Sequence, residues 1–144
     1  IFDGASVIAG NPTRLVADFY AFEQTLTNGV YISAGDVNGD GFADLAFGAG
    51  PGGAPRVTGI DGSSLIAGRI TPVFDFFVGD ANARGGVPVH LQDIDNDGRS
   101  ELITGTAAGQ TSLVKIFDVG NGPGRELDEF YANWKDFLGG VFVG

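Results

Sequence analysis

The sequence predicts an all-β chain built from β-propeller-type blades, each made of four antiparallel strands. Its 25 glycines and 6 prolines separate short apolar runs, a pattern typical of strands joined by tight turns. An aspartate-rich hexapeptide begins at Asp36 and recurs at Asp93, 57 positions later. Strand-like segments recur around both copies with a similar spacing. These observations together indicate a repeat architecture in which each unit supplies one small sheet.

Two further elements recur with the hexapeptide. An aromatic pair begins at Phe19, Phe76 and Phe130, and in each copy a Gly-Val pair follows, with its valine 11 positions after the phenylalanine. The N-terminal segment IFDG is similar to GIDG and IFDVG later in the chain. We expect the three equivalent phenylalanines to fill the space between blades.

Each full unit is expected to run through strand, oxygen-rich loop, strand, glycine bend, strand ending in Asp-Gly, turn and strand. The predicted strands are 30–35, 43–49, 55–60 and 65–77 in one unit, and 87–92, 100–106, 112–117 and 126–131 in the next. We therefore expect a single repeat region over 1–144, with full blades at about 30–86 and 87–140 and partial blades at both ends, about 1–29 and 141–144. A closed propeller has about 4–8 blades. Two full blades therefore predict either self-association through open blade edges or a fragment of a longer ring.

The chain is strongly acidic, with 18 Asp and Glu against 8 Lys and Arg and a formal net charge of −10. This balance disfavours nucleic acid and anionic membrane surfaces as partners, since both bind through clustered basic groups. The absence of cysteine excludes disulfides and thiolate metal sites. No apolar run is long enough to insert across a bilayer. Acidic groups gathered in loops point instead to a cation.

Two loops carry oxygen ligands at the same positions and predict two Ca²⁺ sites. Positions 1, 3, 5 and 9 offer side-chain oxygens, position 6 is glycine, and position 7 offers a backbone carbonyl, as a curled loop around a hard cation requires. The candidate ligands are Asp36, Asn38, Asp40, Phe42 and Asp44 in the first loop, and Asp93, Asp95, Asp97, Arg99 and Glu101 in the second.

Other interpretations of these loops are weaker. An EF-hand needs a bidentate glutamate at position 12, where the chain has Phe47 and Thr104, and it needs flanking helices. A dockerin-type loop also needs an oxygen ligand at position 12. Asp, Asn and Gly also form turns without any ion. Two loops with acids at positions 1, 5 and 9 nevertheless favour calcium.

The chain resembles the FG-GAP/VCBS repeat family, whose calcium-loop blades also occur in integrin alpha-subunit propellers. The resemblance rests on the paired loops, on Phe47-Gly48 and on Gly53-Ala54-Pro55. It implies a β-propeller with Ca²⁺ in the hairpin between the first two strands of a blade. Glu101 departs from the usual aspartate at position 9, and the second unit lacks the Gly-Ala-Pro bend.

Motifs that would indicate catalysis are weak. The sequence GAGPGG matches a dinucleotide fingerprint, but its prolines and the strand-like residues that follow argue against the required helix. His90 is the only histidine and has no obvious partner. No serine lies in a nucleophile elbow. Asp128 and Glu129 are more simply explained by a solvated strand edge than by a glycosidase pair. We therefore expect no enzymatic activity.

The leading hypothesis is a calcium-stabilised module for protein–protein interaction, adhesion or assembly on a secreted or cell-surface protein, bacterial in origin. A carbohydrate-binding, lectin-like propeller is the alternative. It rests on Trp134, which lies outside the repeated core positions and could stack on a sugar. A hydrolase or lyase on a propeller scaffold is the third hypothesis.

Overall fold

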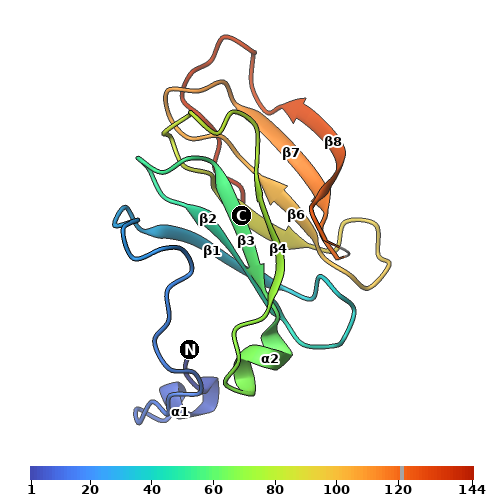
Figure 1. Ribbon diagram of the computed structural model, residues 1–144. Helices are drawn as coiled ribbons and strands as arrows, with labels where there is room; N and C mark the ends of the chain where they lie inside the picture. Colours follow the sequence, from blue (N-terminus) through green and yellow to red (C-terminus); the bar gives the residue numbers. More distant parts are fainter. Residues whose placement is uncertain (121) are drawn as a thin grey trace.

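The computed structural model describes residues 1–120 and 122–144 and contains two four-stranded antiparallel sheets (Figure 1). In both sheets the strands follow one another in chain order, so each sheet is a simple meander. This confirms the all-β prediction of four-stranded blades. The first sheet consists of β1 (Val30–Gly35), β2 (Asp44–Ala49), β3 (Arg56–Ile60) and β4 (Pro72–Phe77), and the second of β5 (Val89–Gln92), β6 (Glu101–Thr104), β7 (Leu113–Asp118) and β8 (Arg125–Tyr131).

The predicted strand bounds agree within two residues for seven of the eight strands, and the exception is 65–77. Residues Gly62–Ile66 form the short helix α2 instead, and β4 begins only at Pro72. Asp61 is the N-cap of α2, because its carboxylate accepts the Ser64 backbone N–H at 2.7 Å. Beyond the helix, the chain turns back and pairs with β3.

The N-terminal segment repeats this arrangement in a reduced form. Helix α1 (Gly4–Ile8) has Asp3 as its N-cap, and the Asp3 carboxylate accepts the Ser6 backbone N–H at 2.7 Å. A single antiparallel bridge between Phe2 and Arg14 stands where the following unit has the β3–β4 pair. Figure 1 shows α1 and α2 at the same end of the molecule.

The main core lies between the two sheets, whose first strands β1 and β5 run beside each other. Phe76 of the first sheet packs edge-on against Phe117 of the second, with ring centroids 5.3 Å apart. The buried members of this core are Val37, Ala46, Val57 and Phe74 from the first unit and Val87, Val89, Leu91, Leu102, Phe117 and Val119 from the second.

A second, smaller core joins the N-terminal segment to the opposite face of the first sheet. Val16 packs with Phe47, Ile60 and Leu65, and Phe19 contacts Phe47 edge-on with centroids 6.0 Å apart. Alternate residues of β2 therefore face different neighbours, as the strand periodicity requires.

The repeated phenylalanines do not all behave as expected. Phe19 and Phe76 pack between neighbouring units, as the repeat predicts. The prediction is wrong for Phe130, which is 47% exposed because no further sheet covers that face in the described part of the chain.

Backbone contacts also fix the spacing between units. A methyl group on Gly48 would overlap the Val87 carbonyl oxygen, so only glycine allows the second unit to approach β2 so closely. The Val87 N–H donates to the Ala49 carbonyl at 2.9 Å. At the C-terminus the Val141 N–H donates in the same way to the Thr106 carbonyl at 2.7 Å. The glycine of the Phe-Gly pair is thus a packing requirement between neighbouring units.

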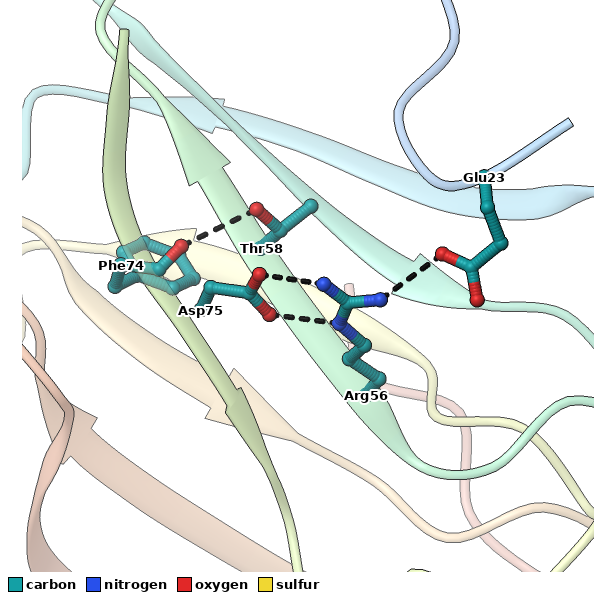
Figure 2. A network of polar contacts seen from close by, with 5 residues as sticks. All are labelled: Glu23, Arg56, Thr58, Phe74 and Asp75. Atoms are coloured by element: carbon teal, nitrogen blue, oxygen red, sulfur yellow. Dashed lines mark hydrogen bonds and ion pairs between the residues drawn. The ribbon is translucent and has the colours of Figure 1, made fainter.

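Arg56 connects the N-terminal segment to the first sheet (Figure 2). Its Nε and Nη2 donate to the two carboxylate oxygens of Asp75 on β4 at 2.8 and 2.6 Å. Its Nη1 donates to Glu23 in the segment before β1 at 3.0 Å, and its guanidinium lies 5.6 Å from the centre of the Phe22 ring. This partly exposed network supplements the apolar contacts of the smaller core. Within the described residues, neither helix has the length and apolar character needed to span a bilayer.

Candidate metal centre

The two oxygen-rich loops are neighbours at one edge of the molecule. The first connects β1 to β2, and the second connects β5 to β6. Figure 1 shows both loops projecting on the same side. They are joined directly, because the Ser100 N–H donates to the Asp36 backbone carbonyl at 2.6 Å. Two candidate sites from different units therefore lie side by side.

The side chains of the first loop accept hydrogen bonds from the loop's own backbone. Both carboxylate oxygens of Asp36 are used: Oδ1 accepts the Gly39 N–H at 2.7 Å and Oδ2 accepts the Gly41 N–H at 2.8 Å. The Asn38 Oδ1 accepts the Asp40 N–H at 2.9 Å. The loop is curled as predicted, and these bonds hold the curl.

Asp44, at position 9 of the first loop, is fully buried at the start of β2. Its Oδ2 accepts the Val37 N–H at 3.0 Å, and its Oδ1 accepts the Gly62 N–H of α2 at 2.8 Å. Burial raises the pKa of Asp44, while the two backbone donors oppose that rise. The carboxylate therefore ties the loop to the first turn of the helix.

Helix α2 also holds the first loop through Asn38. The Asn38 Nδ2 donates to Asp61 Oδ1 at 3.0 Å. Hydrogen bonds from Ser64 and Ser63 lower the pKa of Asp61, and the Asn38 contact adds to this effect. The sequence prediction missed this link because it expected a turn followed by a strand from residue 65, where the structure has α2. The signal that could have revealed it was Asp61 three residues before Ser64, a helix N-cap spacing.

The second loop has a similar curl. The Asp93 Oδ2 accepts the Gly98 N–H at 3.0 Å, and the Asp95 Oδ1 accepts the Asp97 N–H at 3.1 Å. The Asp97 Oδ1 accepts the Arg99 N–H at 2.8 Å. These bonds match those that Asp36, Asn38 and Asp40 make 57 positions earlier.

The second loop has the carboxylate of Asp95 at position 3, where the first loop has the amide of Asn38, and three of its carboxylates lie close together. Asp93, Asp95 and Glu101 each place one oxygen within 4.8 Å of the others, and they are the one such group of acids or histidines in the described residues. Glu101 is buried, and its Oε2 accepts the Ile94 N–H at 3.0 Å. Burial raises the pKa of Glu101, and the charges of Asp95 and Asp97 add to the rise.

The environment of Asp93 Oδ1 indicates whether the second loop suits a cation. It is buried, and it lacks a hydrogen-bond partner among the described residues. A buried carboxylate oxygen without a partner is costly, and the closeness of the Asp93, Asp95 and Glu101 carboxylates adds repulsion. A hard divalent cation bound by oxygen ligands would compensate both penalties, so the donor set of this loop suits Ca²⁺.

The remaining predicted ligands of the second loop are Asp97 and Arg99, and Phe42 is a further one in the first loop. Asp97 and Arg99 line a polar cavity of about 130 Å³ with Asp95 and Glu101. The Arg99 side chain also lies against Gly39 of the first loop and Gly120 after β7. The Phe42 ring is exposed. The roles of the Phe42 and Arg99 carbonyls as ligands stay predictions.

Trp134, the weak candidate for sugar binding, lies in the segment after β8. It is 68% exposed, and its indole packs edge-on against Phe137 with centroids 5.3 Å apart. Trp134 is thus both exposed and in contact with an aromatic residue of its own segment.

The comparison with protein families matches residues 28–66 to the FG-GAP repeat. The match spans β1, the first oxygen-rich loop, β2, β3 and α2. No curated protein and no solved structure shows significant similarity to the chain. The second sheet repeats the strand order of the first and carries the equivalent loop. Residues 28–66 therefore match an FG-GAP repeat, and the two four-stranded sheets give the chain a β-propeller-type repeat organisation.

Proposed function

We propose that the chain is a calcium-stabilised module that works in extracellular protein–protein interaction, adhesion or assembly. Two observations carry this proposal: carboxylate oxygens of Asp93, Asp95 and Glu101 lie within 4.8 Å of one another, and Asp93 Oδ1 is buried without a hydrogen-bond partner among the described residues. These three residues would hold the ion, and Asp97, which lines a cavity with Asp95 and Glu101, would supply a further oxygen. A bound Ca²⁺ supplies positive charge that offsets the mutual repulsion of the loop acids.

Binding of the ion would order the loop and thereby hold the two strands that it joins in place. The loop joins β5 to β6, and it contacts the first loop through the bond from Ser100 to Asp36. Ordering it therefore fixes one hairpin and one boundary between units. Extracellular modules bind Ca²⁺ with a Kd of about 10⁻⁴–10⁻³ M, which suits calcium-rich surroundings outside the cell. The proposal assigns the chain no catalytic role.

The test is a thermal melt of metal-free protein with added CaCl₂, MgCl₂ or chelator. Binding at a hundredfold excess over Kd adds about 2.7 kcal/mol. With an unfolding entropy of about 2.1 cal/mol/K per residue, this raises Tm by about 9 °C for 144 residues. A Tm that is the same in calcium and in chelator, with no binding heat by calorimetry, would refute the proposal.

The partner in this proposal is another protein or a second copy of the chain, bound through open blade edges. The edge strand β8 is exposed along its whole length and carries Glu126, Asp128 and Glu129, of which Glu126 and Glu129 form ion pairs with Lys115 of β7. Such charges discourage pairing with another acidic edge. A partner at β8 should therefore bring basic residues, and light scattering at low and high salt would test that requirement.

A second candidate is carbohydrate binding, favoured by the exposed Trp134 beside Phe137. An exposed indole offers an apolar face on which a sugar ring can stack. A glycan array with the Trp134→Ala variant as control separates the two candidates. Binding that is lost in the variant supports this one, and an array without any signal eliminates it.

A further inference from the structure

We propose that the cavity between the two sheets binds a small neutral ligand with the size and chemistry of a single sugar ring. The cavity has a volume of about 310 Å³ and lies at the end of the strands away from the oxygen-rich loops. Ligand pockets measure about 300–1,000 Å³, so this one suits a small ligand. The inference shares its ligand class with the second candidate function, but Trp134 does not line this cavity.

A hollow occurs at the same place on both boundaries between units, but its lining differs. Between the N-terminal segment and the first sheet, a hollow of about 240 Å³ is lined mainly by aromatic and aliphatic side chains. At the spacing of 57 positions, the cavity between the sheets has Gly79, Ala83 and Thr104 in place of Phe22, Leu26 and Phe47. The second boundary is therefore polar where the first is aromatic.

The register of the sheets confirms that Thr104 and Phe47 are equivalent. Phe47 of β2 pairs with Thr58 of β3, and Thr104 of β6 pairs with Lys115 of β7. Phe47 packs against the N-terminal segment in the smaller core. By the alternation of side chains along a strand, Thr104 faces the first sheet from the equivalent position.

The hydroxyl of Thr104 is poorly satisfied inside the protein. The residue is only 2% exposed, and its Oγ1 makes one hydrogen bond among the described residues, to the Lys115 carbonyl at 3.4 Å. An ordinary bond between two oxygens measures about 2.7–2.8 Å. Burying a hydroxyl without a good partner costs free energy. A hydroxyl of a ligand in the cavity would supply that partner.

Gln110 adds a second polar group to the lining. It is half-buried, and its amide nitrogen reaches across to Gly85, where it would lie 3.2 Å from an added Cβ. The amide offers both donors and an acceptor, as a hydroxylated ligand requires. The Thr106 hydroxyl donates to the Thr111 carbonyl and accepts the Leu113 N–H at 3.2 Å, which holds the bend around Gln110 in shape.

The charged groups of the lining already have partners, so they do not favour a charged ligand. Lys115 Nζ forms ion pairs with Glu126 at 2.7 Å and with Glu129 at 2.9 Å. The Asp80 Oδ1 accepts the Asn82 N–H at 2.8 Å and the Asn82 Nδ2 at 3.1 Å. An anion would meet a lysine whose charge is balanced by two carboxylates, and a neutral ligand avoids the cost of losing its hydration as an ion.

The rest of the lining is largely aliphatic and includes Val78, Val87 and Leu113. Small-molecule sites combine such an apolar surface with a few polar groups that fix the orientation of the ligand. A sugar ring carries hydroxyl groups along its edge and C–H groups on its faces. The edge matches Thr104 and Gln110, and a face matches the aliphatic surface.

The test is a titration of the full chain followed by the NMR shifts of its backbone amides. Glucose, galactose, mannose and N-acetylglucosamine are the neutral probes, and glucuronic acid and glucosamine are the charged ones. A ligand of about a dozen heavy atoms should bind with a Kd of about 10⁻³ M. At least one neutral sugar should shift the amides of Thr104, Thr106 and Gln110, and it should bind more tightly than either charged probe.

Three variants locate the site. Thr104→Phe restores the residue of the equivalent position and fills the cavity, so it should weaken binding at least about tenfold without lowering Tm. Thr104→Val removes the hydroxyl at nearly constant size and should weaken binding about two- to tenfold, the value of one hydrogen bond. Trp134→Ala should leave binding unchanged. If Thr104→Phe does not fold, Thr104→Val and the shifted amides still decide.

Three results would overturn the inference. The first is that no neutral sugar binds, or that a charged probe binds more tightly. The second is that both Thr104 variants bind as the wild type does. The third is that the shifted amides surround Trp134 and binding is lost in Trp134→Ala, which would support the second candidate function instead. None of these results bears on calcium binding, which the thermal melts test separately.

Discussion

Replacing Asp44 by asparagine should destabilise the protein even when no calcium is present. The carboxylate is fully buried and accepts N–H groups from Val37 and Gly62, so it joins the first loop to helix α2. Asparagine keeps the shape but turns one acceptor into an NH₂ group. One of the two backbone donors then faces another donor inside the protein.

The size of the effect follows from those two bonds. A hydrogen bond to a charged group contributes about 1.5–3 kcal/mol, and a buried donor left unpaired costs about 1–3 kcal/mol. Removing the buried charge recovers part of its desolvation cost, so we expect a net loss of about 3 kcal/mol. For 144 residues with an unfolding entropy of about 2.1 cal/mol/K each, Tm should fall by about 10 °C.

The assay is a thermal melt in chelator at neutral pH, followed by circular dichroism. Asp40→Asn is the matched control, since Asp40 is exposed and accepts one N–H, from Phe42, at 2.8 Å. Its Tm should fall by no more than about 3 °C, equivalent to about 1 kcal/mol. Equal shifts for the two variants would show that Asp44 does not anchor the loop as described.

Two other substitutions test the packing between units and the capping of the helix. Gly48→Ala should destabilise by about 1–3 kcal/mol, because its methyl group overlaps the backbone of the next unit. Gly4→Ala is the control, as a methyl there meets nothing within 4 Å in the described structure, and a melt should separate the two. Asp61→Ala should lower the stability by about 1 kcal/mol through loss of the α2 cap, measured by urea unfolding. Asp3→Ala removes the equivalent cap from α1. Because α1 buries no residue whereas α2 does, this variant should lose less stability, and an equal loss would contradict the greater structural role of the Asp61 cap.

The strands were predictable because their signals are local and repeated. Glycine-bounded apolar runs and the spacing between Asp36 and Asp93 gave the two sheets and most strand bounds. The predicted strand 65–77 is wrong in its first part, because Asp61 caps a short helix and β4 begins only at Pro72. A helix of five residues leaves too short a pattern for periodicity to reveal.

The candidate site was predictable in composition but not in geometry. Residue spacing identified both loops and the acids in them, and it treated Asp44 and Glu101 as equivalent. The structure distinguishes them through Gly62, which lies 18 residues beyond Asp44 and reaches it only in the folded chain. Long-range donors of this kind leave no mark in the spacing of the loop itself.

The close approach at Gly48 bears on how such a molecule can diverge. Main-chain atoms set the spacing between adjacent modules there. The Val87 carbonyl lies against Gly48, which has no side chain, and the Val87 N–H donates to the Ala49 carbonyl. The angular step from one module to the next is thus set by peptide groups, which every residue except proline provides in full. Amino acids on the outward surfaces can then be exchanged freely for new recognition tasks while the curvature of the array is preserved.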